Sequence, residues 1–338
     1  MGISNGFDDT KISPRLTPGL AYPIWKRWVR FKAANGSIYG GEPVDADVDV
    51  GLALAEKRDV AVKVVTGASA LDYDVSFTGE VKFIDELLSP VSQAEAGTVR
   101  CIGLNYKEHA AEMKMALPSI PTVFLKASTC IASASEPILL PSTVDYDEAD
   151  YEVELAIIIG KFCKNVSVGD ASNYILGYSV ANDVTARKHQ EKTSQWSYAK
   201  GMDGFCPLGP CIVSIKQIPN PSVLQLRTYL NGIMMQEGSA DDMIFSIPEI
   251  VSYLSQACAA KQNYNTSFLT RSGAHAIAWN GYHYWHALWN RGVAKATALL
   301  TARGRSANQH KPWAGYSTLP NCQRLRRRFR TLQLEPFR

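Results

Sequence analysis

The sequence predicts a mostly β fold with short helices, an α+β arrangement in which a small N-terminal domain precedes a larger β-rich domain. The main observation is a series of short segments rich in β-branched residues, with turn residues about every 8 to 12 positions. A second observation is that helical patterns are few and short. At 338 residues and 46% hydrophobic content, the chain can bury a sizeable core.

The charge pattern argues against nucleic acid as a partner. The formal net charge is only +3, and the excess of basic residues lies near the C-terminus, at Arg324, Arg326, Arg327, Arg328 and Arg330. No window approaches the roughly 20 apolar residues that a membrane-spanning helix needs. We therefore expect neither nucleic acid nor a membrane as a partner.

The cysteine pattern favours a reducing compartment. The seven cysteines are odd in number and scattered, and no two of them form a C-x-x-C pair. The N-terminus also lacks a basic region followed by an apolar run. We expect a cytoplasmic protein, with a mitochondrial location as the alternative.

The first part of the chain, residues 1–97, is expected to form the small N-terminal domain. It begins with a loose polar leader of about 20 residues. The segments WVRFKA and SIYGGEPV then flank an Asn35-Gly36 turn signal, which predicts a β-hairpin. No acids, bases or potential ligands cluster here, so we expect an accessory role.

Residues 98–256 alternate apolar strands with short helices. The expected strands are TVRCIGLN, PTVFLKAS, YEVELAIIIGK, YILGYSVAND, GPCIVSI and LQLRTYLNG. The segment KEHAAEMKMA predicts a helix. A second helix, in IFSIPEIVSYLSQ, should begin after Ser246 as N-cap, with Glu249 completing a capping box.

Two glutamates, Glu152 and Glu154, supply the sharpest local signal. Side chains two positions apart on a strand project from the same face, so both carboxylates should converge on one spot. Such convergence suits a hard cation such as Mg²⁺, Mn²⁺ or Ca²⁺, whereas the alternative is a solvated acidic face. The apolar run that follows, residues 155–160, indicates a buried strand and favours the metal site.

Asp183 ends the next apolar segment and is a candidate third ligand, although a lone Asp there is commonly a turn or cap residue. Arg187 follows it closely and offers a bidentate fork for a substrate carboxylate. Its alternative is an exposed basic face. Gln190 lies on the same segment.

His109 and Glu112 stand three residues apart in KEHAAEMKMA, hence on one helix face, where the carboxylate can orient the imidazole. The same spacing is common on surface helices. Lys200 precedes a Gly-rich turn that would bring backbone close to a ligand, although a lone Lys is usually solvated.

Taken together, six segments resemble successive blocks of the fumarylacetoacetate hydrolase superfamily, in the branch of fumarylacetoacetate hydrolase domain-containing proteins. These segments are GLNYKEHAAEM, PTVFLKAS, DYEVELAIIIGK, GYSVANDVTARKHQ, QWSYAKGMDGFCPLGP and LQLRTYLNG with Gln236. The resemblance covers roughly residues 99–256. It implies a β-rich catalytic domain over 98–256, Mg²⁺ or Mn²⁺ as cofactor, and a homodimer.

The resemblance also assigns roles by position. It implies that Glu152, Glu154 and Asp183 are metal ligands, that His109 and Glu112 form a catalytic dyad on a lid helix, that Lys200 is an active-site lysine, and that Arg187 and Gln190 contact substrate.

The implied activity is metal-dependent chemistry on small 2-oxo or 1,3-dicarbonyl acids through a metal-bound enolate. Oxaloacetate tautomerase, oxaloacetate decarboxylase and acylpyruvate C–C hydrolase activities all remain open. The alternative is a non-catalytic, destabilised product of such a gene.

That alternative comes from residues 257–338, which lack the pattern of the preceding domain. The tryptophan codon TGG becomes a glycine codon, GGN, in the next reading frame, so Trp279, Trp285 and Trp289 become glycines with the spacing of the superfamily's LLPGTxxxTGTPxGxG block. We interpret this segment as an aberrant tail produced by a frame shift, for example through a retained intron. A divergent C-terminus is the alternative. The C-terminal strands are accordingly expected to be missing, with few regular elements after residue 256.

Overall fold

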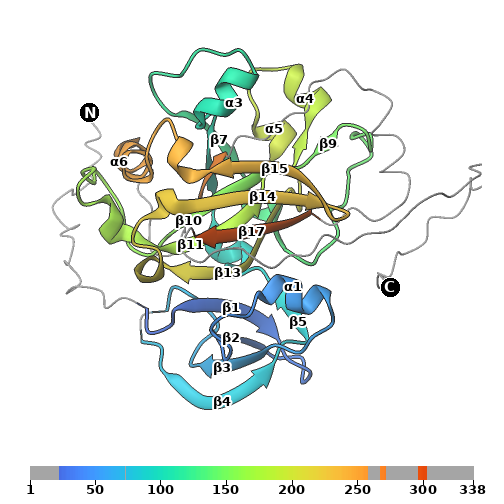
Figure 1. Ribbon diagram of the computed structural model, residues 1–338, viewed down its shortest axis with the longest axis vertical. Helices are drawn as coiled ribbons and strands as arrows, with labels where there is room; N and C mark the ends of the chain where they lie inside the picture. The colour runs from blue at the N-terminus through green and yellow to red at the C-terminus, as the bar shows by residue number, and fades with distance from the viewer. Residues whose placement is uncertain (1–22, 73, 258–266, 272–295, 303–338) are drawn as a thin grey trace, which may run out of the picture.

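A computed structural model describes residues 23–72, 74–257, 267–271 and 296–302. The fold is mostly β with short helices, as the sequence predicted (Figure 1). One extended sheet runs through it, in the strand order β4-β3-β2-β1-β13-β11-β10-β16-β6-β7. No helix among the described residues is long and apolar enough to span a membrane.

The N-terminal strands form one end of this sheet and are drawn in blue at the bottom of Figure 1. Their elements are β1 (Arg27–Lys32), β2 (Ile38–Pro43), α1 (Val50–Ala55), β3 (Ala61–Val65), β4 (Phe77–Phe83) and β5 (Glu86–Leu88). The predicted hairpin is confirmed: β1 and β2 pair antiparallel, and Gly36 adopts φ 80° in the turn. Asn35 Oδ1 accepts a hydrogen bond from the Ser37 amide at 3.0 Å.

The join between the two parts of the sheet depends on Trp28, which is fully buried in β1. Its register partner on β13 is Ile212, and its indole nitrogen donates to the Pro90 carbonyl at 3.2 Å. A side chain at Gly40 would place its Cβ 2.0 Å from the Trp28 ring. Only glycine therefore allows β2 to pass so close to this indole.

The larger part of the sheet carries the segments that the sequence identified as strands. Its elements are α2 (Gln93–Ala96), β6 (Val99–Gly103), β7 (Thr122–Lys126), β8 (Ile131–Ser133), β10 (Val153–Ile159), β11 (Ile175–Asn182) and β13 (Cys206–Ser214). Short strands β9 (Ala149–Asp150) and β12 (Thr185–Ala186) pair separately. A hairpin of β14 (Leu224–Leu230) and β15 (Ile233–Ser239) packs nearby.

Helices are short, as expected. They are α3 (Lys107–Glu112), α4 (Arg187–Glu191), α5 (Ser197–Lys200) and α6 (Ile247–Ala257), with 3-10 turns at Ser128–Cys130, Ala171–Tyr174, Ile215–Gln217, Pro221–Val223 and Ala240–Asp242. The capping box of α6 is confirmed: the Ser246 amide and hydroxyl both donate to Glu249 Oε2, at 2.7 and 2.6 Å. Helix α3 is shorter than predicted because the chain turns away from it at Lys114, where φ is 53°.

Strand β10 is buried along its whole length, as the apolar run predicted. Leu155, Ile157 and Ile159 pack in one core cluster, which also contains residues of α6. Ala156 and Ile158 face the opposite side and pack with the cluster that contains Trp28. Both faces of this strand are covered, so groups at its start lie inside the protein.

Two strands come from the predicted tail. Strand β16 (Ser267–Arg271) lies between β10 and β6, and β17 (Ala296–Ala302) pairs antiparallel with β14. The sequence predicted few regular elements after residue 256, and the structure describes these two strands in that segment. Both strands form by backbone pairing with neighbouring strand edges. The rest of the frame-shift prediction lies outside the described residues.

Candidate metal centre

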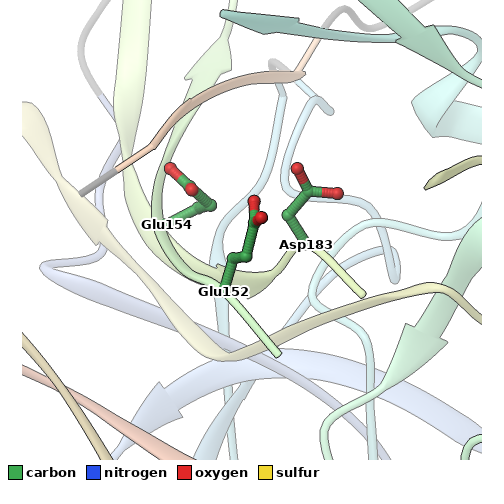
Figure 2. Close-up of side chains that lie close together, drawn as sticks. All are labelled: Glu152, Glu154 and Asp183. Atoms are coloured by element: carbon green, nitrogen blue, oxygen red, sulfur yellow. The ribbon is translucent and has the colours of Figure 1, made fainter. Parts of the chain in front are cut away.

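Three acidic residues converge at the adjoining ends of β10 and β11. Glu154 lies in β10, Glu152 directly precedes that strand, and Asp183 directly follows β11. One carboxylate oxygen from each lies within 4.8 Å of the others, and all three side chains are buried. Figure 2 shows the three side chains lying close together.

Strand pairing produces this convergence. The antiparallel register matches Val153 with Asn182, so the residues on either side of that pair meet. The Asp183 amide donates to the Glu152 carbonyl at 2.8 Å, and the Glu152 amide donates to Asn182 Oδ1 at 3.1 Å. The expectation that both glutamates face one spot therefore agrees with the geometry, although the assigned strand begins one residue after Glu152.

Lys200, at the end of α5, is buried against two of these carboxylates. Its ammonium group lies 2.8 Å from Glu152 Oε2 and 2.9 Å from Asp183 Oδ2, and it donates to Thr185 Oγ1 at 2.7 Å. The side chain is 1% exposed. The solvated alternative for this lysine is wrong, because its side chain is buried in the acidic cluster.

Lys126 is a second buried lysine, and sequence reasoning did not assign it a role. Its Nζ lies 2.7 Å from Asp183 Oδ1, and it also donates to the carbonyls of Phe205, Val184 and Lys200. Burial opposes its charge, but the Asp183 carboxylate and neighbouring groups outweigh burial and hold its pKa above the ordinary range.

Buried and exposed residues alternate along β7, and this alternation is the sequence signal that could have identified Lys126. Phe124 and Lys126 are buried, whereas Val123 and Leu125 are exposed. A lysine in register with the inward face of a strand must find a buried partner, since an uncompensated charge there is costly.

Arg187 holds acidic residues of the same site. Its Nε and Nη2 donate to Asp150 Oδ2 at 2.8 and 2.6 Å, and its Nη1 lies 2.7 Å from Glu152 Oε1. Nη1 also donates to Gln190 Oε1 at 3.0 Å. The exposed-face alternative does not apply, and the bidentate fork predicted for a substrate is here turned to Asp150.

His109 and Glu112 lie on α3, as predicted, with 3.8 Å between His109 Nδ1 and Glu112 Oε2. His109 is buried, whereas the Glu112 side chain is 26% exposed. The start of the helix is tied to the chain before α6: the Glu108 amide donates to Asp242 Oδ2 at 2.9 Å. Neither member of this pair belongs to the acidic triad.

The triad fits a hard divalent cation. Ligand atoms bound to one ion at about 2.0 to 2.6 Å are at most about 4 to 5 Å apart, and the separation of the three oxygens falls in that range. All three donors are carboxylate oxygens, which Mg²⁺ and Mn²⁺ prefer over softer ligands. Glu152, Glu154 and Asp183 are therefore the residues that could hold the ion.

Comparison with known proteins supports the same family. The protein-family model described as fumarylacetoacetate (FAA) hydrolase C-terminal matches residues 98–263. Caffeoylpyruvate hydrolase from Neonothopanus nambi is 39% identical over 69% of this chain and 76% of the relative. The mitochondrial oxaloacetate tautomerase fahd2 of Xenopus laevis is 36% identical over 56% of this chain and 59% of the relative.

Solved structures agree with the fold. The crystal structure of 2-hydroxyhepta-2,4-diene-1,7-dioate isomerase from Mycobacterium marinum superposes with a TM-score of 0.61 and 31% sequence identity. The match covers 74% of this chain and 88% of that structure. The extent of both kinds of match, together with the six motif blocks, leads to one conclusion: the chain belongs to the fumarylacetoacetate hydrolase family of enzymes.

Proposed function

We propose that this protein is a divalent-metal-dependent enzyme that acts on small 2-oxo or 1,3-dicarbonyl acids, with Mg²⁺ or Mn²⁺ held by Glu152, Glu154 and Asp183. The buried acidic triad carries this proposal. A bound cation supplies Lewis-acid polarisation of a keto oxygen and so favours the enolate form of the acid.

The charges around the triad favour an anionic substrate. The four carboxylates of the triad and Asp150 face three cationic groups, those of Lys126, Lys200 and Arg187, which leaves one negative charge. A divalent cation reverses that sign, and a net positive buried site attracts a carboxylate of the substrate. We therefore propose 2-oxo carboxylic acids, such as oxaloacetate or an acylpyruvate, as the substrate class.

The proposed proton-transfer group is His109, with Glu112 orienting its imidazole. At 3.8 Å the pair is longer than a hydrogen bond, and such contacts commonly tighten when substrate binds. Lys200 would stabilise negative charge that develops on a substrate oxygen. Arg187 would hold Glu152 in position. Gln190, which accepts a hydrogen bond from Arg187, would contact the substrate.

Assays on two substrates address which reaction occurs. Names of relatives point to hydrolysis of an acylpyruvate and to tautomerisation of oxaloacetate. Ultraviolet absorbance follows enol loss from oxaloacetate, and product analysis distinguishes tautomerisation, decarboxylation and C–C hydrolysis. Absence of all three activities from protein that binds the cation would contradict the proposed function.

The cation site is tested with Glu154→Gln, which keeps the side-chain shape and removes the charge. Calorimetric titration with Mn²⁺ should detect binding to the wild type and none to the variant, and activity should fall with it. Glu80→Gln is the matched control, because Glu80 pairs with Lys82 on the exposed strand β4. Equal binding by Glu154→Gln and wild type would overturn the metal assignment.

His109→Ala separates catalysis from metal binding. Turnover should fall by about 10² to 10⁴-fold, the contribution typical of a general acid–base, with Mn²⁺ affinity unchanged. Loss of both together would mean that His109 is structural.

We further propose a homodimer, in keeping with the family resemblance. Strand β7 ends the sheet as described, and its Val123 and Leu125 are exposed. Nearby Leu117 and Ile120 are exposed too, so an apolar surface adjoins this edge. Light scattering of wild type and Leu125→Glu would test it: the wild type should have twice the chain mass and the variant should dissociate.

The alternative of a non-catalytic chain receives no support from β16 and β17, which pair with strands of the catalytic part. Sequencing the transcript around residues 256–273 tests the frame-shift hypothesis directly. For location, we propose the cytoplasm, with the mitochondrion as the alternative suggested by the name of the Xenopus relative; cell fractionation distinguishes the two.

A further inference from the structure

The buried amide of Gln236, in the middle of β15, bonds to the backbone that carries two of the triad residues. Its Oε1 accepts from the Val153 amide at 3.0 Å, and its Nε2 donates to the Tyr151 carbonyl at 3.0 Å. Oε1 also accepts from Thr228 Oγ1 at 2.7 Å, across the hairpin. The amide thus joins the β14–β15 hairpin to the start of β10.

The chemistry of the partners fixes the orientation of this amide. The Val153 N–H can only donate and the Tyr151 carbonyl can only accept, so the oxygen must face the first and the NH₂ group the second. The Thr228 hydroxyl then supplies the second donor for Oε1. A flipped amide would lose both backbone bonds.

Gln236 acts where strand pairing stops. Strand β16 pairs with β10 from Glu154 onward, opposite Arg271. The opposite edge is held by β11 through the bond from Asp183 to the Glu152 carbonyl. Because alternate residues of a strand form backbone hydrogen bonds to opposite edges, the Tyr151 carbonyl and the Val153 amide point away from β11. On that side the Gln236 amide forms the hydrogen bonds that a neighbouring strand would otherwise form.

We propose that Gln236 is a positioning residue that fixes the Glu152 and Glu154 carboxylates in the geometry needed for a divalent cation. This inference rests on the proposed metal site. Tyr151 and Val153 flank Glu152, and Val153 lies between the two ligands, so the amide holds the backbone from which both carboxylates project. Groups that orient ligands in this way are commonly worth about 10- to 100-fold in metal affinity.

The test uses Gln236→Leu, which keeps the approximate side-chain size and removes all three hydrogen bonds. Two quantities are measured: hydrogen exchange of the Val153 amide, and Mn²⁺ affinity by calorimetry. Exchange should become faster and Mn²⁺ affinity should fall about 10- to 100-fold. Gln225→Leu is the matched control, because Gln225 lies on the same hairpin and bonds instead to Ser239 Oγ at 2.7 Å. It should leave both quantities unchanged.

Thr228→Val is a second, milder variant, which keeps Gln236 and removes only one of its hydrogen bonds. It tests the role of Gln236 if Gln236→Leu does not fold. It should speed Val153 exchange and weaken Mn²⁺ binding, each less than Gln236→Leu. Unchanged exchange and affinity in the folded variants would overturn the proposal, as would equal effects of Gln225→Leu. Should wild type bind no divalent cation, the metal assignment fails and Val153 exchange alone decides whether Gln236 holds this backbone.

Discussion

The N-terminal strands and the strands that follow them share one sheet, yet they bury different kinds of side chain. The core around β1–β5 consists of hydrophobic residues such as Val29, Phe31 and Val62. Among the described residues, the buried His and charged side chains all lie in the larger part: His109, Lys126, Glu148, Glu152, Glu154, Asp183 and Lys200. The same β architecture therefore supports one interior without buried charge and another in which buried charge accompanies a hydrophobic core.

This difference shows in which region stability alone does not explain the choice of buried residues. Burial of charge costs free energy unless partners compensate it, and apolar residues of similar volume would usually serve stability as well or better. The N-terminal core follows that rule, whereas the core between β10, β11 and α5 departs from it. Buried charge therefore indicates the second region as the candidate site of chemistry.

The largest expected effect on stability comes from Lys126→Met. The substitution removes the ammonium group that pairs with Asp183 and leaves that buried carboxylate with less compensation. We expect a loss of about 3 to 5 kcal/mol in the free energy of unfolding, measured by urea denaturation without added metal. The control is Lys82→Met in β4, whose exposed pair with Glu80 should matter little. Equal effects would erase the contrast between the two regions.

The fold and the two glutamates of the triad were predictable because they depend on local pattern, whereas Asp183 was only a candidate because its approach depends on the pairing of β10 with β11. Alternation placed Glu152 and Glu154 on one face, and an unbroken apolar run identified β10 as buried. The pairings made by Lys126 and Arg187 were not predicted, because each joins strands or loops distant in sequence. The shortened α3 was missed as well, since a left-handed backbone at Lys114 leaves no strong sequence signal outside glycine or asparagine.

A smaller effect is expected from Val62→Ala, in the N-terminal core. Val62 is fully buried, so the lost methyl groups leave a cavity and should cost about 1 to 3 kcal/mol. Mn²⁺ affinity should stay at the wild-type value, because Val62 packs in a hydrophobic cluster that contains no residue of the triad. Calorimetry and urea denaturation measure the two quantities. A fall in affinity would show that the N-terminal region supports the triad directly.

The smallest effect is expected at Cys211, which lies on β13 where that strand packs against the N-terminal core. Burial raises the pKa of this thiol from 9.0 to about 11, and the nearby Arg27 only partly opposes the shift. Between these two values the unfolded thiol loses its proton while the folded thiol keeps it, so the folded state binds more protons. Stability contributed by the thiol is therefore complete below pH 9.0 and is lost as pH rises toward 11.

Cys211→Ala removes that titration. Because every other group is shared, the difference in unfolding free energy between wild type and variant isolates the thiol. Urea denaturation at several pH values should show wild type losing stability relative to the variant between pH 9.0 and about 11. Parallel curves would mean that burial does not shift the pKa of this half-buried thiol.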